Sequence, residues 1–181
     1  QFHFVHTAGF LSKLQGNPAA DGFVKWINGI LGVGGGGLMT IGQMSEILVL
    51  VLMPMLATKL SRKSLLLIGL AAYALRMAIF AYMGDSAPMV MAGLALHGLC
   101  FGCFIFVAFM IVDENTTSAG RATAQNLFNL VIVGIGTIVG SIFAANVVGG
   151  WASQGGAMDY QKLFSVPMWM ALGCLLLVLA L

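Results

Sequence analysis

Four internal stretches of the chain are long enough to cross a bilayer as helices and carry almost no charge. They cover residues 38–57, 64–83, 88–112 and 123–148. A bilayer core of roughly 30 Å is crossed by about 20 apolar residues in a helix, whereas barrel strands are shorter and alternate apolar with polar side chains. Residues 160–181 form a fifth such stretch, and residues 1–11 have the character of the last turns of a sixth helix. The pattern predicts an all-α integral membrane protein with six transmembrane helices.

Composition excludes the other common classes of protein. Hydrophobic residues make up 60% of the chain and charged residues only 8%, against about 45–50% and about 25% in soluble domains. The net charge of +2 provides no electrostatic footprint for a nucleic acid. Cys100 and Cys103 form a CxxC pair inside an apolar span with no second pair, which is neither a zinc site nor a redox loop. We expect no metal and no cofactor.

The basic residues orient the chain in the membrane. Lys59, Arg62 and Lys63 crowd the second loop, and Arg121 lies in the fourth. The positive-inside rule places both loops in the cytoplasm of a multi-pass protein of the cell membrane, plasma or inner. The chain starts with Gln1 on an apolar stretch and stops inside another, so we expect a fragment of a longer protein.

A faint internal repeat indicates a transporter. Residues 42–51 (GQMSEILVLV) align with residues 124–133 (AQNLFNLVIV). Each segment lies in the second helix of a set of three, and the two helices run in opposite directions. Inverted three-plus-three repeats build each six-helix half of many secondary transporters. We therefore expect the six helices to form a 3+3 inverted repeat.

A carboxyl group lies deep in the first complete span. Glu46 is about eight residues into that helix, which at about 1.5 Å per residue places it near mid-membrane. A charge there costs at least about 2.5–3.5 kcal/mol, so it must face protein or water. Gln43 shares its helix face, and Pro54 is expected to bend the cytoplasmic half of the helix. We expect Glu46 to be functional; the alternative is a protonated side chain that only packs against a neighbouring helix.

Polar residues also interrupt the next two spans. His97 shares a helix face with Phe101, so the two are candidates for stacking on a planar ligand. The alternative is plain packing, with a neutral His97 that donates to a backbone carbonyl. Arg76 either pairs with an acid such as Glu46 or extends toward the outer interface, and we expect a structural role for it.

Other motifs lack the context that their function needs. The run 32–37 formally matches GxGxxG, but no strand precedes it, so we expect a flexible loop within the long connection 12–37. Gly98 and Gly102 have the spacing of a close helix contact or a gating surface. Asp113, Glu114 and Arg121 form the sole acid–base cluster, and we expect a cytoplasmic loop with a structural or gating role for Arg121, not an enzyme.

Four stretches carry a recognisable pattern. They are residues 41–46 (IGQMSE), residues 61–82 from SRK to ALRMAIFAY, residues 96–98 (LHG) with 111–113 (IVD), and residues 121–125 (RATAQ). With these stretches, which cover most of residues 38–148, the chain resembles the nucleoside:proton symporter family of the major facilitator superfamily. The resemblance implies the C-terminal six-helix half of a twelve-helix transporter, partnered by the lipid bilayer and by a missing N-terminal six-helix half.

The resemblance also implies roles for individual residues. Gln43 and Glu46 would face the central cavity and hydrogen-bond the ribose or base of a nucleoside. His97 stands where the family can carry a tyrosine, and Phe101 matches a base-stacking aromatic residue. Gln1 matches a cavity glutamine of the seventh helix.

Two positions depart from the family pattern. Phe4 stands where an asparagine is expected, and Gly102 stands where some members carry an acid. The loss of that acid leaves Glu46 as the main proton-carrying residue in this half.

The resulting hypothesis is a secondary active transporter that moves nucleosides with protons by alternating access. One alternative keeps the fold and changes the cargo to another small polar solute such as a sugar. A membrane scaffold or a membrane enzyme are further alternatives. A scaffold does not need Gln43 and Glu46 at mid-membrane, and an enzyme needs a reactive cluster at a water interface.

Overall fold

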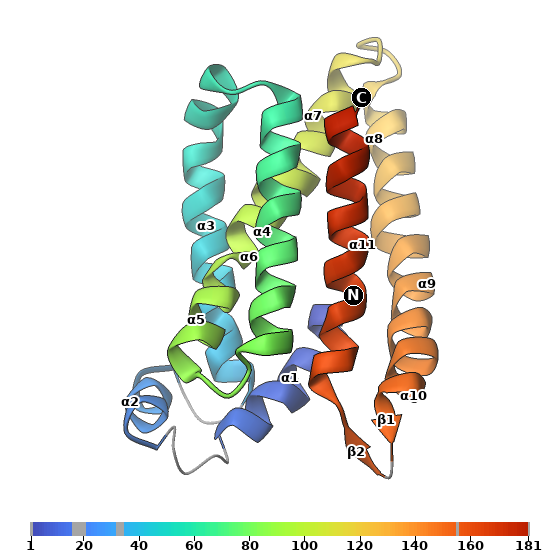
Figure 1. Ribbon diagram of the computed structural model, residues 1–181. Coiled ribbons are helices and arrows are strands. Elements are labelled where there is room, and N and C mark those ends of the chain that lie inside the picture. Colours follow the sequence, from blue (N-terminus) through green and yellow to red (C-terminus); the bar gives the residue numbers. More distant parts are fainter. Residues whose placement is uncertain (1, 16–20, 32–34, 155, 181) are drawn as a thin grey trace.

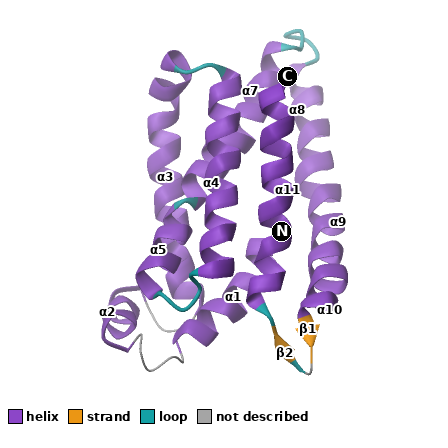
Figure 2. Cartoon of the chain, viewed as in Figure 1, coloured by secondary structure: helices purple, strands orange, loops and turns teal. Residues whose placement is uncertain are grey.

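The protein is almost entirely helical (Figure 2). The computed structural model describes residues 2–15, 21–31, 35–154 and 156–180. The unbroken helices are α1 (Phe2–Gln15), α2 (Asp21–Leu31), α3 (Gly35–Lys59), α4 (Arg62–Tyr82) and α11 (Tyr160–Ala180). The long helices stand side by side, and a short hairpin lies at one end (Figure 1). Its two-residue strands are β1 (Ser153–Gln154) and β2 (Ala157–Met158), which pair antiparallel.

Two of the spans are built from several helical segments. The first consists of α5 (Ala87–Ala95), α6 (His97–Cys100), the π-helical turn η2 (Phe101–Phe106) and α7 (Val107–Glu114). The second consists of α8 (Arg121–Asn129), η3 (Leu130–Ile135), α9 (Gly136–Ile142), η4 (Phe143–Val148) and α10 (Gly149–Ala152), where η3 and η4 are also π-helical. Such turns are rare and frequently lie at functional sites.

Five of the described helical stretches are long and apolar enough to cross a membrane. They are Gly37–Lys59, Arg62–Tyr82, Ala87–Glu114, Arg121–Ala152 and Tyr160–Ala180. Each lies within a few residues of a span expected from the sequence. The 14-residue α1 is shorter than a full span.

The connection expected as a long glycine-rich loop contains a helix, so that prediction is wrong for α2. The arrangement of polar and apolar residues around the helix makes α2 amphipathic. Ile27 is buried, whereas Trp26 and Ile30 are exposed. In Figure 1, α2 lies at the lower end, outside the row of long helices. An amphipathic helix with an exposed tryptophan in this place is typical of the membrane interface.

The core joins α4 to its neighbours. The rings of Phe10, Phe80 and Phe164 meet at centroid distances of 5.3–5.4 Å and tie α1, α4 and α11 together. The contact between α4 and α11 is the most extensive between any two elements. A smaller cluster around Met53 and Val107 joins α3 to η2 and α7. Large apolar side chains remain exposed along α3 and α8–α10, as expected for helices that meet lipid or other helices.

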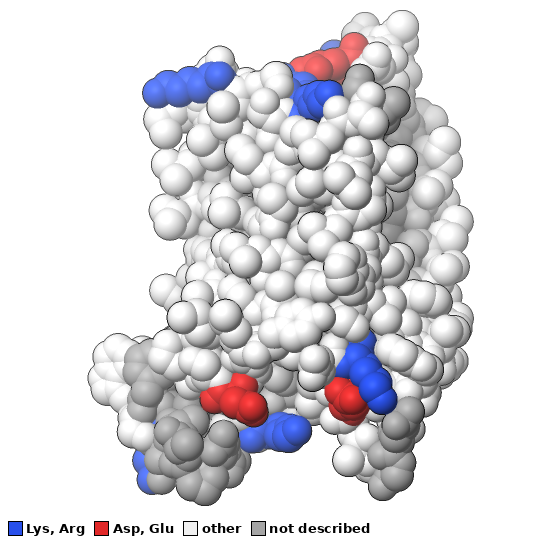
Figure 3. All heavy atoms as spheres, viewed as in Figure 1, with Lys and Arg blue, Asp and Glu red and all other residues white. Residues whose placement is uncertain are grey.

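Charged side chains gather at the two ends of the face seen in Figure 3, and the surface between them is uncharged. At one end, Arg62 pairs with Glu114 at 2.6 Å and Arg121 pairs with Asp113 at 2.8 Å. The acid–base cluster of the sequence is therefore a pair of salt bridges that link α4 to α7 and α7 to α8.

At the opposite end, Asp159 caps α11. Its carboxylate accepts a hydrogen bond from the backbone N–H of Lys162 at 3.1 Å, and this bond lowers the pKa of Asp159 below its ordinary value of 3.8. A lowered pKa means that the cap stabilises the fold above the ordinary value and that this stabilisation is lost as the pH falls through the folded-state value. We expect Asp159→Ala to lower the melting temperature at pH 7 and to lower it less at pH 3. Parallel melts of the two proteins in detergent at both pH values measure this, and an equal difference at both would contradict the capping role.

Candidate functional site

Three polar side chains from three different spans meet inside the apolar bundle. The Nδ1 atom of His97 lies 2.9 Å from Nη1 of Arg76, and Nε2 of the same ring lies 3.6 Å from Oε2 of Glu46. The side chains of His97 and Glu46 are 15% and 24% exposed. The three residues thus form a chain from α3 through α6 to α4, which we call the Glu46–His97–Arg76 chain.

A close backbone contact places His97 beside Glu46. Gly98 has no side chain, and a Cβ at this position would lie 2.3 Å from the carbonyl oxygen of Ser45. The N–H of Gly98 donates to Oγ of Ser45 at 3.0 Å across the same contact. Small residues at such crossings let two membrane helices approach closely. The start of α6 is therefore held against the middle of α3.

Arg76 is fully enclosed by the fold. It is 1% exposed, and its guanidinium lies over the ring of Phe80 with Cζ 5.4 Å from the ring centroid. A cation over an aromatic face is attracted by the ring quadrupole. Arg76 does not extend toward the interface, and the hydrogen bond to His97 links it to Glu46.

His97 also faces a cavity of about 460 Å³ that we call the His97 cavity. Its lining is mostly apolar and comes from α1, α4, α6, η2, α9, η4 and α11. The lining includes Tyr73, Arg76, His97, Phe101, Phe104 and Phe143. The ring of Phe101 lies 6.4 Å from the His97 ring, centroid to centroid. The volume and the aromatic lining suit a small planar ligand.

The remaining predicted site residues are spread over the bundle. Gln43 is exposed on α3, one turn before Glu46, and neither residue lines the His97 cavity. Pro54 lies inside the continuous helix α3. Gln1 lies outside the described residues. His97 and Phe101 therefore line the His97 cavity, whereas Glu46 contacts His97 without lining it.

The departure at Gly102 has a packing explanation. A Cβ at this position would lie 2.7 Å from Cγ1 of Val49 and 3.2 Å from Cε of Met53. Any side chain here displaces side chains of α3, so the structure has no room for an acid at position 102. Glu46 is the acidic side chain that the described part of the bundle provides in contact with His97.

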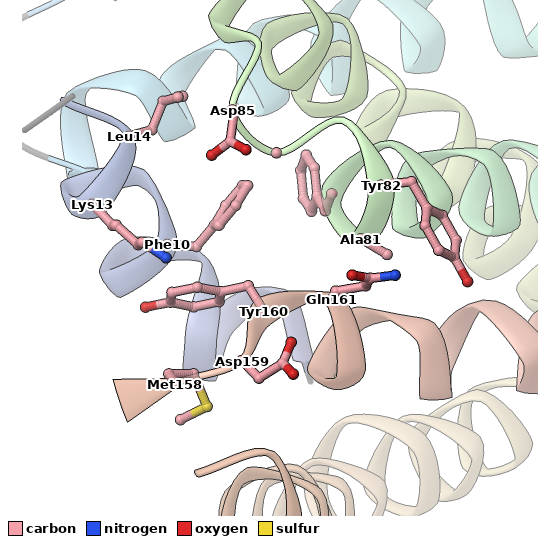
Figure 4. A pocket seen from close by; sticks show the side chains of 12 residues that line it. Phe10, Lys13, Leu14, Ala81, Tyr82, Asp85, Met158, Asp159, Tyr160 and Gln161 are labelled. Carbon is pink, nitrogen blue, oxygen red and sulfur yellow. The ribbon is translucent and has the colours of Figure 1, made fainter. Parts of the chain in front are cut away.

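A second cavity, of about 680 Å³, lies at the end of the bundle near the hairpin (Figure 4). The rings of Phe10 and Tyr160 lie side by side in it, with Asp85 above and Asp159 below them in this view. The ammonium of Lys13 lies 5.5 Å from the centroid of the Tyr160 ring. None of the predicted site residues that the structure describes lines this cavity.

Sequence reasoning missed two contacts of the site. The serine next to Glu46 holds α6 through its hydroxyl, and the Arg76–His97 hydrogen bond joins residues that are 21 positions apart. The two residues lie on different helices, and no local sequence pattern relates positions that are 21 residues apart. Within the described residues, no three His, Cys, Asp or Glu side chains are placed to hold a metal ion. His6, for example, contacts the backbone oxygen of Ala144 at 2.9 Å.

Apolar membrane-spanning helices around a buried polar cluster and an aromatic cavity are the architecture of a membrane transporter. The family model of the nucleoside H⁺ symporters matches residues 1–181. The chain belongs to this family.

Curated proteins with related sequences are permeases. Nucleoside permease NupG of Escherichia coli (strain K12) is 32% identical over 133 residues, which are 71% of this chain and 31% of that protein. Xanthosine permease of the same organism is 29% identical over 162 residues, which are 87% of this chain and 37% of that protein. The chain thus spans about a third of the length of these relatives.

The fold matches a solved transporter. The crystal structure of nucleoside transporter NupG superposes with a TM-score of 0.82 at 24% identity, over 99% of this chain and 44% of that one. The predicted fold class is confirmed, because the chain has the all-helical membrane fold of the C-terminal half of that transporter. The expected localisation is confirmed too: the chain is a multi-pass protein of the cell membrane.

Proposed function

We propose that the complete protein is a secondary active transporter that moves nucleosides together with protons by alternating access. Membership of the nucleoside H⁺ symporter family and the permease relatives support the substrate and the proton. The chain covers 44% of the solved nucleoside transporter that it matches, which supports a partner half that supplies the opposite wall of the pathway. Relatives that are permeases also argue against a membrane enzyme.

The observation that carries this proposal is the Glu46–His97–Arg76 chain. It places a carboxyl group, an imidazole and a guanidinium inside spans that are otherwise apolar. Ionisable groups inside membrane spans mark proton and substrate pathways. In this proposal Glu46 takes a proton from the outer side. Nucleoside binding by Gln43, Glu46, His97 and Phe101 follows, and the two halves then rock about the site.

The proton has to change a free energy in this cycle in order to drive uptake. A ligand shifts a conformational equilibrium only by its differential affinity for the two states. Protonation of Glu46 removes a negative charge from the site, so the protonated protein and the deprotonated protein bind a neutral nucleoside differently. That difference is the coupling between the two cargoes.

Uptake measurements test the proposal. We expect cells that express the full-length transporter to accumulate labelled uridine or adenosine, and we expect a protonophore to abolish the accumulation. Cells with the empty vector are the control. A well-expressed, membrane-inserted protein that takes up neither nucleoside would leave the fold in place and refute the nucleoside as cargo, which favours another small polar solute such as a sugar.

A further inference from the structure

The hydrogen bond between Arg76 and His97 determines where the proton of the imidazole lies. A guanidinium carries only donors and stays charged in proteins, so it cannot accept a hydrogen bond. Because Nη1 of Arg76 lies 2.9 Å from Nδ1 of His97, Nδ1 must be the acceptor and carries no hydrogen. The single proton of the neutral ring is then on Nε2, which lies 3.6 Å from Oε2 of Glu46.

The surroundings keep the guanidinium in this place. Arg76 is 1% exposed, is contributed by α4 and lies over the ring of Phe80. A second proton on His97 would have to sit on Nδ1, where it would face a donor of like charge at 2.9 Å. Both the lost hydrogen bond and the repulsion of two cations at this distance oppose that protonation.

Titratable groups reach His97 from two other helices. Glu46 faces it from α3, Arg76 and Tyr73 line the same cavity from α4, and Cys100 lies on α6 itself. Glu46 is the acid among them. The other acidic side chains whose contacts or cavities the structure describes, such as Asp113 and Asp159, lie at the ends of the long helices.

We propose that Arg76 is a positioning residue that holds His97 as a neutral ring with its hydrogen on Nε2, so that His97 is a fixed donor and Glu46 alone carries the proton. This inference rests on the proposed function, because it concerns the same site. When Glu46 is ionised, its carboxylate attracts the Nε2–H. When Glu46 is protonated, the Nε2–H is released to an acceptor of the ligand, such as a hydroxyl or carbonyl oxygen of a nucleoside. Proton binding thereby favours substrate binding through one hydrogen bond that changes partner.

The pH dependence of nucleoside exchange tests the role of Arg76. In proteoliposomes with the full-length transporter, we expect Arg76→Met to free Nδ1 and to allow His97 to become a cation. The cation attracts the Glu46 carboxylate more strongly than the neutral ring does, so its Nε2–H is not released to the ligand. Exchange by this variant should fall about tenfold from about pH 7.5 to about pH 5.5, as an unperturbed histidine titrates. Arg76→Lys, which restores a cationic donor, should return the wild-type profile. In the Arg76→Met background, His97→Gln should remove the tenfold fall between these pH values, whatever its absolute rate, because glutamine does not titrate. Arg62→Met removes an arginine from the edge of the membrane and serves as the matched control.

A spectroscopic measurement decides the question even if an Arg76 variant fails to fold or no nucleoside is transported. In the ¹⁵N NMR spectrum of histidine-labelled wild-type protein, the signal that His97→Gln removes should be that of a neutral ring with a bare Nδ1 and a protonated Nε2 from pH 5 to pH 8. A protonated Nδ1 in this range, or a wild-type pH profile in folded Arg76→Met, would overturn the inference. The neutral-ring signal together with absent uptake would uphold the inference on Arg76 and refute the nucleoside as cargo.

Discussion

Glu46→Gln is expected to abolish uphill accumulation of nucleoside while exchange of nucleoside across the membrane continues. Glutamine has nearly the shape of a protonated glutamate and is likewise uncharged, so the Nε2–H of His97 stays available to the ligand and the binding site persists. It cannot release a proton, so the proton gradient no longer changes the free energy of any step. The internal concentration of labelled uridine should stop at the external concentration, and counterflow of preloaded uridine should remain. Uptake in proteoliposomes with an imposed pH gradient measures both quantities.

Glu114→Gln is the matched control for this experiment. Like Glu46, Glu114 is a glutamate that contacts a basic side chain: it forms a salt bridge with Arg62 at 2.6 Å. This pair is largely exposed at the edge of the bundle, and exposed pairs contribute about 0–1 kcal/mol. The control should accumulate uridine as the wild-type protein does. Wild-type accumulation by Glu46→Gln would rule out Glu46 as the proton carrier.

Gly98→Ala is expected to destabilise the protein and to abolish transport. The new Cβ would lie 2.3 Å from the carbonyl oxygen of Ser45 and 2.7 Å from the backbone nitrogen of Glu46. Both atoms belong to the backbone of α3, so α3 and α6 must move apart rather than let a side chain rotate. Overpacking of this kind costs typically about 1–3 kcal/mol, occasionally more. The same separation removes His97 from Glu46, so uptake should be lost even at temperatures at which the protein is folded.

Gly173→Ala separates this effect from the general effect of a glycine replacement. Gly173 lies within α11, and a Cβ there would meet nothing within 4 Å. Alanine also favours a helix by about 1 kcal/mol over glycine. Melting curves in detergent and uridine uptake should show an unchanged or slightly more stable, active protein. Equal behaviour of the two variants would contradict the close contact between α3 and α6.

The positions of the membrane spans were predictable from the sequence, because each span is a run of about 20 apolar residues and such a run is easily recognised. Glu46 and His97 were also predictable as site candidates, since a single polar group in such a run is conspicuous. The amphipathic α2 was missed because flanking glycines dominate its surroundings. The π-helical turn η2 packs against α3 and α4, and apolar periodicity alone does not reveal it.

Contacts between spans were not predictable from one sequence. Arg76 had three possible partners or directions, and only the packing of α4 against α6 selects His97. The sequence placed Gln43 with Glu46 and His97 with Phe101 on two helix faces, but it did not reveal that only the second pair lines the His97 cavity. Which face of a helix meets which neighbour depends on the whole bundle, and local sequence patterns carry little of that information.

The pairing of α4 with α11 has a mechanical consequence. These helices are joined at one end by the rings of Phe80 and Phe164 and at the other by Lys63, whose Nζ donates to the backbone oxygen of Leu179 at 3.4 Å. The two helices are therefore held together at both ends, and Arg76 belongs to this pair. His97, by contrast, belongs to a span that is broken at Leu96 and again at η2. A shift of this span relative to α4 and α11 by about one ångström takes the Arg76–His97 contact beyond hydrogen-bond length. A small helix displacement therefore changes which ring nitrogen of His97 can carry a proton.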